Sequence, residues 1–88
     1  MFKVGSDDEA ISLANDSQYG LGGSIISENL ERAEKVASKI DTGMIFINEF
    51  TKSDHRIPYG GVKSSGYGWE FGEAGIREFT NQKPYWFA

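Results

Sequence analysis

The chain has 88 residues, of which 39% are hydrophobic, 14% aromatic and 25% charged, a composition typical of one small globular unit. Its 13 acidic and 9 basic side chains give a formal net charge of −4, and no basic cluster favours nucleic acid as a partner. The absence of cysteine excludes thiol nucleophiles, disulfides and thiolate metal sites from these residues, and a single histidine excludes a multi-histidine metal site. The longest apolar run, Met44–Ile47, is too short for a membrane span or a signal core, so we expect a cytoplasmic protein without a membrane partner.

The first predicted element is a helix over residues 7–15. Ser6 and Glu9 have the spacing of a capping box, in which the Ser6 hydroxyl accepts from the Glu9 amide and the Glu9 carboxylate reaches back to the Ser6 amide. Apolar residues then recur at helical spacing until Asn15. A strand is expected next, from Leu21 to Ser27, with β-branched residues toward its end.

A second helix is predicted over about 30–40, because apolar residues recur every three or four positions after a possible cap at Ser27 or Asn29. The run Met44–Ile47 is apolar without alternation, which is typical of a strand covered on both faces in a parallel sheet. A long loop, a short helix near 72–80 and an aromatic strand close the chain. This order favours an α/β fold with helices packed on a mostly parallel sheet.

The long loop contains a glycine-rich stretch over residues 57–68. The step from Lys63 to Ser64 resembles the end of a phosphate-binding loop, but Val62 stands where that motif needs glycine. No glycine lies five residues before Lys63 either. A small nucleotide-phosphate binder is therefore disfavoured, and a surface loop whose glycines provide unusual backbone angles is the simpler interpretation.

Aromatic side chains gather in the same region, at Tyr59, Tyr67, Trp69 and Phe71. They can line an apolar substrate pocket or fill a small core, and the sequence leaves both possibilities open. The lone histidine, His55, is more typical of a solvated loop residue than of a general base, because no activated hydroxyl stands in a suitable pattern.

Four segments, in order along the chain, resemble motifs of the aldehyde dehydrogenase superfamily. They are Asn15 with the YGLGGS stretch 19–24, the GMIFIN stretch 43–48, the IPYGGVKSSGYG stretch 57–68, and the GIREFT stretch 75–80 followed by Lys83. The resemblance covers nearly the whole chain, and it is greatest to the succinate-semialdehyde dehydrogenase branch.

The resemblance implies that residues 1–80 form the C-terminal part of the family's catalytic domain and residues 81–88 an oligomerisation strand. The nucleophilic cysteine, the general base and the dinucleotide-binding region of the family would then lie upstream. No catalytic, cofactor-binding or metal-binding residue is therefore expected in this chain, and NAD or NADP is expected only in the full-length parent. The expected partners are the remainder of the parent enzyme and a second copy, joined through Lys83–Phe87. The chain alone is expected to be inactive.

The resemblance also implies where substrate would bind. Phe50 and Tyr59 occupy positions at which the family presents aromatic side chains to the aldehyde. Ser53 and Arg56 lie in the stretch most like the succinate-semialdehyde branch. Ser53 or Arg56 would hold the carboxylate of such a substrate while its aldehyde is oxidised to an acid. Trp69 stands where the family usually has arginine, so an ion pair of that arginine does not carry over. The alternative function is a stand-alone small binding or assembly module without catalytic activity.

Overall fold

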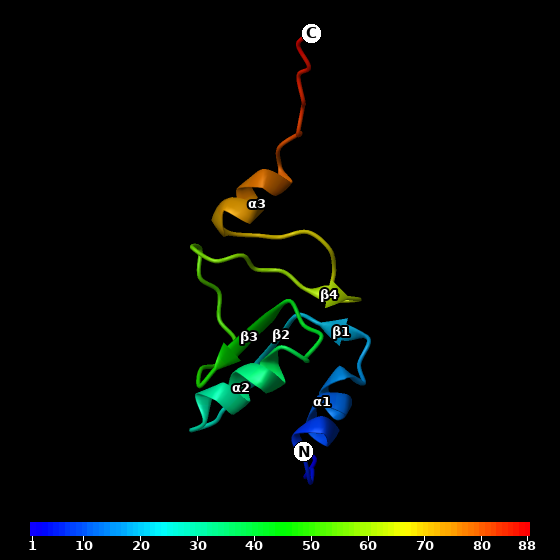
Figure 1. The fold of residues 1–88 in the computed structure, drawn as a ribbon, viewed down its shortest axis with the longest axis vertical. Helices are drawn as coiled ribbons and strands as arrows, with labels where there is room; N and C mark the ends of the chain where they lie inside the picture. The colour runs from blue at the N-terminus through cyan, green and yellow to red at the C-terminus, as the bar shows by residue number, and fades with distance from the viewer.

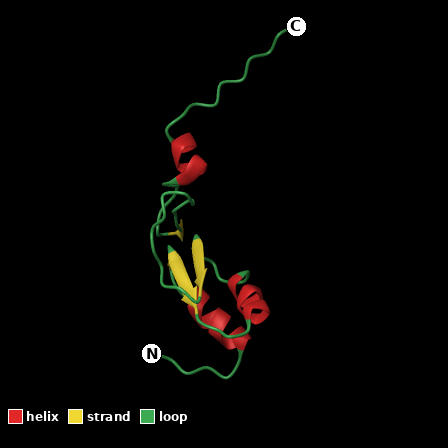
Figure 2. Cartoon of the chain, turned by 90° about the vertical axis from the view of Figure 1, so that its left-hand side faces the viewer, coloured by secondary structure: helices red, strands yellow, loops and turns green.

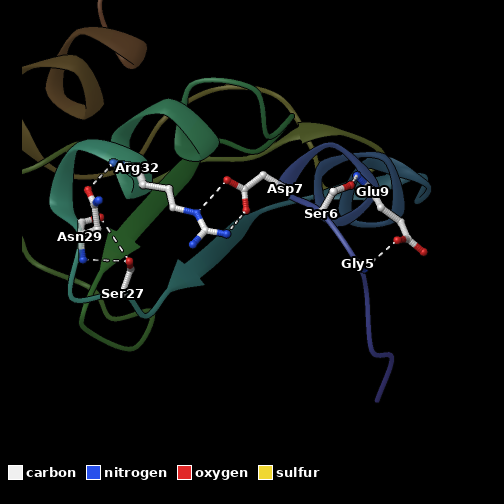
Figure 3. A network of polar contacts seen from close by, with 7 residues as sticks. All are labelled: Gly5, Ser6, Asp7, Glu9, Ser27, Asn29 and Arg32. Atoms are coloured by element: carbon white, nitrogen blue, oxygen red, sulfur yellow. Dashed lines mark hydrogen bonds and ion pairs between the residues drawn. The ribbon is translucent and has the colours of Figure 1, made fainter.

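The computed structural model describes residues 1–88, and its first helix begins at the predicted cap. Helix α1 spans Asp7–Asn15, and the Ser6 hydroxyl accepts a hydrogen bond from the Glu9 amide at 3.1 Å. The return bond predicted for the capping box is wrong by one residue, since the Glu9 carboxylate accepts from the amide of Gly5 at 2.8 Å (Figure 3). Both bonds still satisfy backbone amides at the start of α1, which have no carbonyl partner within the helix.

Helix α2 spans Leu30–Ala37, and its start confirms the prediction of a polar cap. The Asn29 carboxamide accepts from the Arg32 amide at 2.9 Å, while the Ser27 hydroxyl supports Asn29 by accepting from its amide at 3.1 Å (Figure 3). The helix ends three residues before the predicted position 40. The amides of Lys39 and Ile40 bond to carbonyls three residues back, so the last turn tightens instead of continuing the α-helix.

An ion pair connects the two helices. The Arg32 guanidinium donates to both carboxylate oxygens of Asp7, at 2.8 and 2.5 Å (Figure 3). This hydrogen bond from Arg32 lowers the pKa of Asp7 below its usual value and raises the pKa of Arg32.

The strands form two separate pairs. Strand β2 (Gly22–Ile25) runs parallel to β3 (Met44–Ile47), as predicted for the apolar run, and helix α2 lies against β3. Strand β1 (Tyr19–Gly20) instead pairs antiparallel with β4 (Val62–Lys63). The strand predicted from Leu21 to Ser27 is confirmed as β2, which is one residue shorter at its start and two at its end, whereas β1 was not predicted. The mostly parallel sheet is correct only for the β2–β3 pair. The α/β class itself is confirmed.

Helix α3 spans Gly72–Glu78, close to the predicted 72–80. The strand expected at Lys83–Phe87 does not form within the single chain, in which residues 81–88 have no regular secondary structure and no backbone partner. Its pairing with a second copy stays a prediction. Figures 1 and 2 show this tail extending away from the rest of the molecule. A strand needs a second backbone to pair with, and the chain itself supplies none here.

The chain is elongated and has almost no core. Its radius of gyration is 16.6 Å, against about 12 Å for a compact domain of this length, and its principal extents are 61 × 25 × 24 Å. Four residues are buried; three are glycines, and Ala33 is the only one with an apolar side chain. Most large apolar side chains are exposed, whereas an independent domain buries most of its large apolar side chains in its own core. None of its helices has the length and apolar character needed to cross a bilayer.

Candidate functional site: a glycine junction and an aromatic loop

Three glycines from distant parts of the sequence meet at one junction, formed by Gly20, Gly43 and Gly60. A Cβ atom on Gly43 would lie 1.8 Å from the Gly60 carbonyl oxygen, and one on Gly20 would lie 2.6 Å from the carbonyl oxygen of Asp41. The Ser65 hydroxyl, from the loop after β4, accepts from the Gly20 amide at 2.9 Å. Glycine is therefore required here by the close approach of backbones, and the junction fixes the aromatic loop to the first half of the chain.

Two asparagines from the family-like segments connect elements through their carboxamides. Asn15, at the end of α1, donates to the Lys39 carbonyl and accepts from the Asp41 amide, both at 2.8 Å. Asn48, directly after β3, accepts from the Ser27 amide at 2.8 Å and donates to the Ser27 carbonyl at 2.9 Å. Asn48 also has a positive φ of 58°, which asparagine tolerates better than most residues. Both side chains therefore have structural roles.

Lys63 is engaged by backbone carbonyls. Its ammonium group donates to the carbonyl oxygens of Asn15 and Ser17, each at 3.1 Å, and lies 4.0 Å from the carboxylate of Asp41. A cation at the C-terminus of α1 also complements the helix dipole. This placement gives Lys63 a role in joining β4 to α1, and it leaves the ammonium unsuited to cradling a phosphate.

The aromatic loop, residues 55–72, folds back on itself. Tyr59 and Glu70 face each other as an antiparallel bridge, with amide-to-carbonyl distances of 2.8 and 2.7 Å. The Gly72 amide closes the wider end by donating to the His55 carbonyl at 2.9 Å. The two halves of the loop therefore lie side by side, and both the backbone amide and the backbone carbonyl of Tyr59 are hydrogen-bonded to Glu70.

Three aromatic side chains of this loop, Tyr59, Tyr67 and Trp69, line an open groove of about 430 Å³. Tyr59 and Trp69 are half-buried, and the Tyr59 ring meets the Phe71 ring edge-on with centroids 6.0 Å apart. Tyr67 is fully exposed at the rim. Of the two alternatives left open by the sequence, the structure favours a groove lining, since these rings enclose no core.

Phe71 carries the most unusual backbone of the loop. Its φ is 60° and its ψ is 163°, a region that is populated almost only by glycine. Such a conformation costs about 1–3 kcal/mol and persists only where the surrounding contacts impose it. Phe71 directly precedes α3, but its side chain makes no capping hydrogen bond to the helix. Its strained backbone therefore shapes the loop and does not cap α3. No pattern in the sequence predicts this feature.

The four predicted substrate residues are not gathered into one site. Phe50 is 79% exposed, Ser53 is exposed, and no hydrogen bond or ring contact joins either of them to Tyr59. Arg56 donates through Nε and Nη2 to the two carboxylate oxygens of Asp54, at 2.9 and 2.6 Å. This hydrogen bond from Arg56 holds the pKa of Asp54 far below its usual value and raises the pKa of Arg56.

The inventory of reactive groups in this region is small. His55 is exposed and offers only its backbone carbonyl to the loop. No group of three or more His, Asp or Glu side chains is placed to hold a metal ion. What the region offers is therefore a groove lined by aromatic side chains and the guanidinium of Arg56 beside Asp54.

Comparison with known proteins gives a consistent set of relatives. The chain is 52% identical over 83 residues to succinate-semialdehyde dehydrogenase [NADP(+)] of Deinococcus radiodurans, a match that covers 94% of this chain and 17% of that enzyme. It is 51% identical over 87 residues to a probable succinate-semialdehyde dehydrogenase [NADP(+)] of Synechocystis, covering 99% and 19% respectively.

Solved structures agree with these sequence relatives. The fold superposes with a TM-score of 0.86 and 54% identity on succinic semialdehyde dehydrogenase from Streptococcus pyogenes in complex with NADP+, covering 90% of this chain and 17% of that one. Betaine aldehyde dehydrogenase from Staphylococcus aureus superposes with a TM-score of 0.82 at 43% identity, covering 84% and 15%. The chain thus spans less than a fifth of the length of these relatives. The profile of the aldehyde dehydrogenase family matches residues 1–85, and the chain therefore belongs to the aldehyde dehydrogenase family.

Proposed function

We propose that this chain is a segment of an NAD(P)-dependent aldehyde dehydrogenase that oxidises succinate semialdehyde to succinate. In that enzyme it supplies one wall of the aldehyde pocket and contacts between subunits, and it has no activity alone. The observation that carries the proposal is the glycine junction, at which segments that resemble the family meet while most large apolar side chains stay exposed. Exposed apolar surface of this extent is typical of a part that is completed by further protein.

The chemistry divides between this chain and the remainder of the parent enzyme. The chain has no cysteine to attack an aldehyde. Its glycine loop does not fit a dinucleotide phosphate, because the Lys63 ammonium already bonds to the carbonyls of Asn15 and Ser17. We therefore assign the nucleophile and the binding of NAD(P) to the remainder, and we assign the aromatic side chains that orient the aldehyde to Tyr59 and Phe50.

Ser53 and Arg56 would recognise the carboxylate of succinate semialdehyde. Asp54 occupies Nε and Nη2 of Arg56, so the Nη1 donors are free to bind a second carboxylate. Asp54 would then act as a fixed support that orients the guanidinium. Arginine suits this task because its planar group binds carboxylates in a defined geometry.

The test is a segment exchange. The matching 83 residues of the Deinococcus radiodurans enzyme are replaced by this chain, and oxidation of succinate semialdehyde is compared with oxidation of butanal, which lacks the carboxylate. We expect the exchanged enzyme to be active.

Arg56→Gln in the exchanged enzyme should raise the KM for succinate semialdehyde about tenfold and leave the KM for butanal unchanged. Lys52→Gln is the matched control, since Lys52 is an exposed cation paired with Glu49 in the same loop. A folded but inactive exchanged enzyme would contradict the function, and an unchanged KM in Arg56→Gln would contradict the substrate assignment.

The tail Lys83–Phe87 would join the parent enzyme to a second copy. Tyr85 and Phe87 stack on each other with ring centroids 6.4 Å apart, as residues on one side of an extended strand do, and Trp86 is 94% exposed. Unpaired extended backbone of this kind favours addition to a sheet edge. Sedimentation of the exchanged enzyme tests this pairing. Tyr85→Pro removes a backbone hydrogen-bond donor from the tail and should lower the oligomeric state. Trp86→Ala keeps every backbone donor and should lower the oligomeric state less.

The exposed aromatic tail also favours the second candidate, a stand-alone assembly module without catalytic activity. That module would self-associate as a bare chain but would not support aldehyde oxidation in the exchanged enzyme. The activity of the exchanged enzyme therefore discriminates between the two functions.

A further inference from the structure

Residues 69–71 hold Tyr59 and Gly60 through three separate contacts. The Tyr59–Glu70 bridge fixes the backbone, the Phe71 ring meets the Tyr59 ring, and the Trp69 indole covers Gly60. A Cβ atom on Gly60 would lie 2.7 Å from Cε3 of the indole, so the ring packs directly on the backbone of the loop. Gly60 is itself buried against Gly43 on its other side. The loop backbone next to Tyr59 is therefore confined between the glycine junction and the indole.

The strained backbone of Phe71 follows from this arrangement. Glu70 bonds to Tyr59, α3 begins one residue after Phe71, and the chain connects the two by turning at Phe71 with a φ of 60°. A non-glycine residue adopts these backbone angles only where the contacts of its neighbours outweigh the energetic cost of its own conformation. Its side chain uses the turn to reach the ring of Tyr59.

We propose that Trp69 is a positioning residue for substrate, acting together with Phe71 by fixing the orientation of Tyr59 at the wall of the groove. The inference rests on the proposed function, in which Tyr59 faces the aldehyde. It predicts that removing the indole changes how substrate fits, and not merely how stable the protein is.

The first test concerns the loop and uses the 88-residue chain itself. Hydrogen exchange of the Tyr59 and Glu70 amides reports directly on the bridge that Trp69 is proposed to hold. Trp69→Ala should speed exchange of both amides about tenfold or more, and Trp69→Phe should preserve most of the protection. Trp86→Ala is the matched control, because it removes the chain's other tryptophan from a fully solvated position. Unchanged protection in Trp69→Ala would overturn the proposal. If that variant does not fold, Trp69→Leu is measured against Trp69→Phe, and equal protection in these two would overturn it.

The second test separates positioning from stability in the exchanged enzyme. Trp69→Ala should raise the KM for succinate semialdehyde at least about threefold with a smaller change in kcat, and Trp69→Phe should restore most of the loss. In a Tyr59→Ala background the same Trp69→Ala change should have no further effect on KM, because Trp69 is proposed to act on substrate only through Tyr59. A loss of kcat alone, or an additive effect in the double variant, would overturn the positioning role. Inactivity of the exchanged enzyme would instead contradict the proposed function, and the hydrogen-exchange result would still decide the role of Trp69 in the loop.

Discussion

The two halves of the chain are built by different means. In residues 5–48, two helices and a parallel strand pair are connected by capped helix ends, a helix-to-helix ion pair and the carboxamides of Asn15 and Asn48. In residues 49–88, α3 has no side-chain cap and the tail has no partner (Figure 2). The first half therefore forms its own framework, whereas the second half depends on the glycine junction and on surfaces that the chain does not cover.

The largest expected effect comes from separating the two halves at the junction. Gly43→Ala would place a methyl group 1.8 Å from the Gly60 carbonyl oxygen, which the backbone cannot accommodate without moving. We expect a loss of more than about 3 kcal/mol in the free energy of unfolding, measured by chemical denaturation. Gly5→Ala is the control, since its methyl group would meet only the Glu9 side chain at 3.6 Å. Equal stability of these two variants would show that the halves are not joined here.

A smaller effect is expected within the first half. Asn15→Ala removes the two hydrogen bonds that connect the end of α1 to Lys39 and Asp41, and should cost about 1–2 kcal/mol. Asn81→Ala, in the unpartnered tail, should change the free energy of unfolding by less than about 0.5 kcal/mol. If both variants are equally stable, the carboxamide of Asn15 does not hold the framework together.

In the second half, the strain at Phe71 is tested by asking whether its alanine or its glycine variant is the more stable. Phe71→Ala and Phe71→Gly both lose the ring contact with Tyr59, but only glycine relieves the positive φ. Phe71→Gly should therefore be the more stable of the two by about 1 kcal/mol, the reverse of the order expected at an ordinary position. Thermal denaturation of the pair measures this difference. An alanine variant that is the more stable one would contradict the strain.

The smallest effect concerns pH and the exposed pair of Asp54 and Arg56. Because the folded pKa of Asp54 is depressed by its hydrogen bond from Arg56, the stabilisation is present above the unfolded pKa of about 3.9 and is lost as the pH falls through the folded value. Arg56→Gln should raise the pKa of Asp54 toward its usual range in an NMR titration of the carboxyl group. Lys52→Gln should leave it unchanged, and a pKa that stays low in Arg56→Gln would contradict the assignment of its cause.

Much of the first half can be predicted from local sequence. Ser6 and Asn29 mark where α1 and α2 begin, because a cap acts within three residues of its own position. The apolar run Met44–Ile47 likewise predicts a strand with a parallel partner. Strand β1 was not predictable in this way, because its residue Gly20 pairs with Val62, which lies more than forty residues away.

The site was predictable only in part. The aromatic residues and Arg56 stand out in the sequence, but their spacing does not show that Asp54 binds Arg56 or that Phe71 has a positive φ. Lys63 resembles a phosphate ligand in sequence and becomes a helix-end contact in the fold, because its partners are backbone carbonyls that carry no sequence signal. The terminal strand stays a prediction for a related reason: its aromatic pattern predicts an extended backbone, whereas its pairing depends on a second chain.

The central claim, that this chain is one part of a larger aldehyde-oxidising enzyme, is tested most directly by reconstitution. The 88 residues are produced alone and together with a Deinococcus radiodurans enzyme that lacks its matching 83 residues, and reduction of NADP by succinate semialdehyde is followed. We predict no reduction by either polypeptide alone and aldehyde-dependent reduction when both are present. Turnover by the 88 residues alone, or none from two polypeptides that demonstrably associate, would contradict the account.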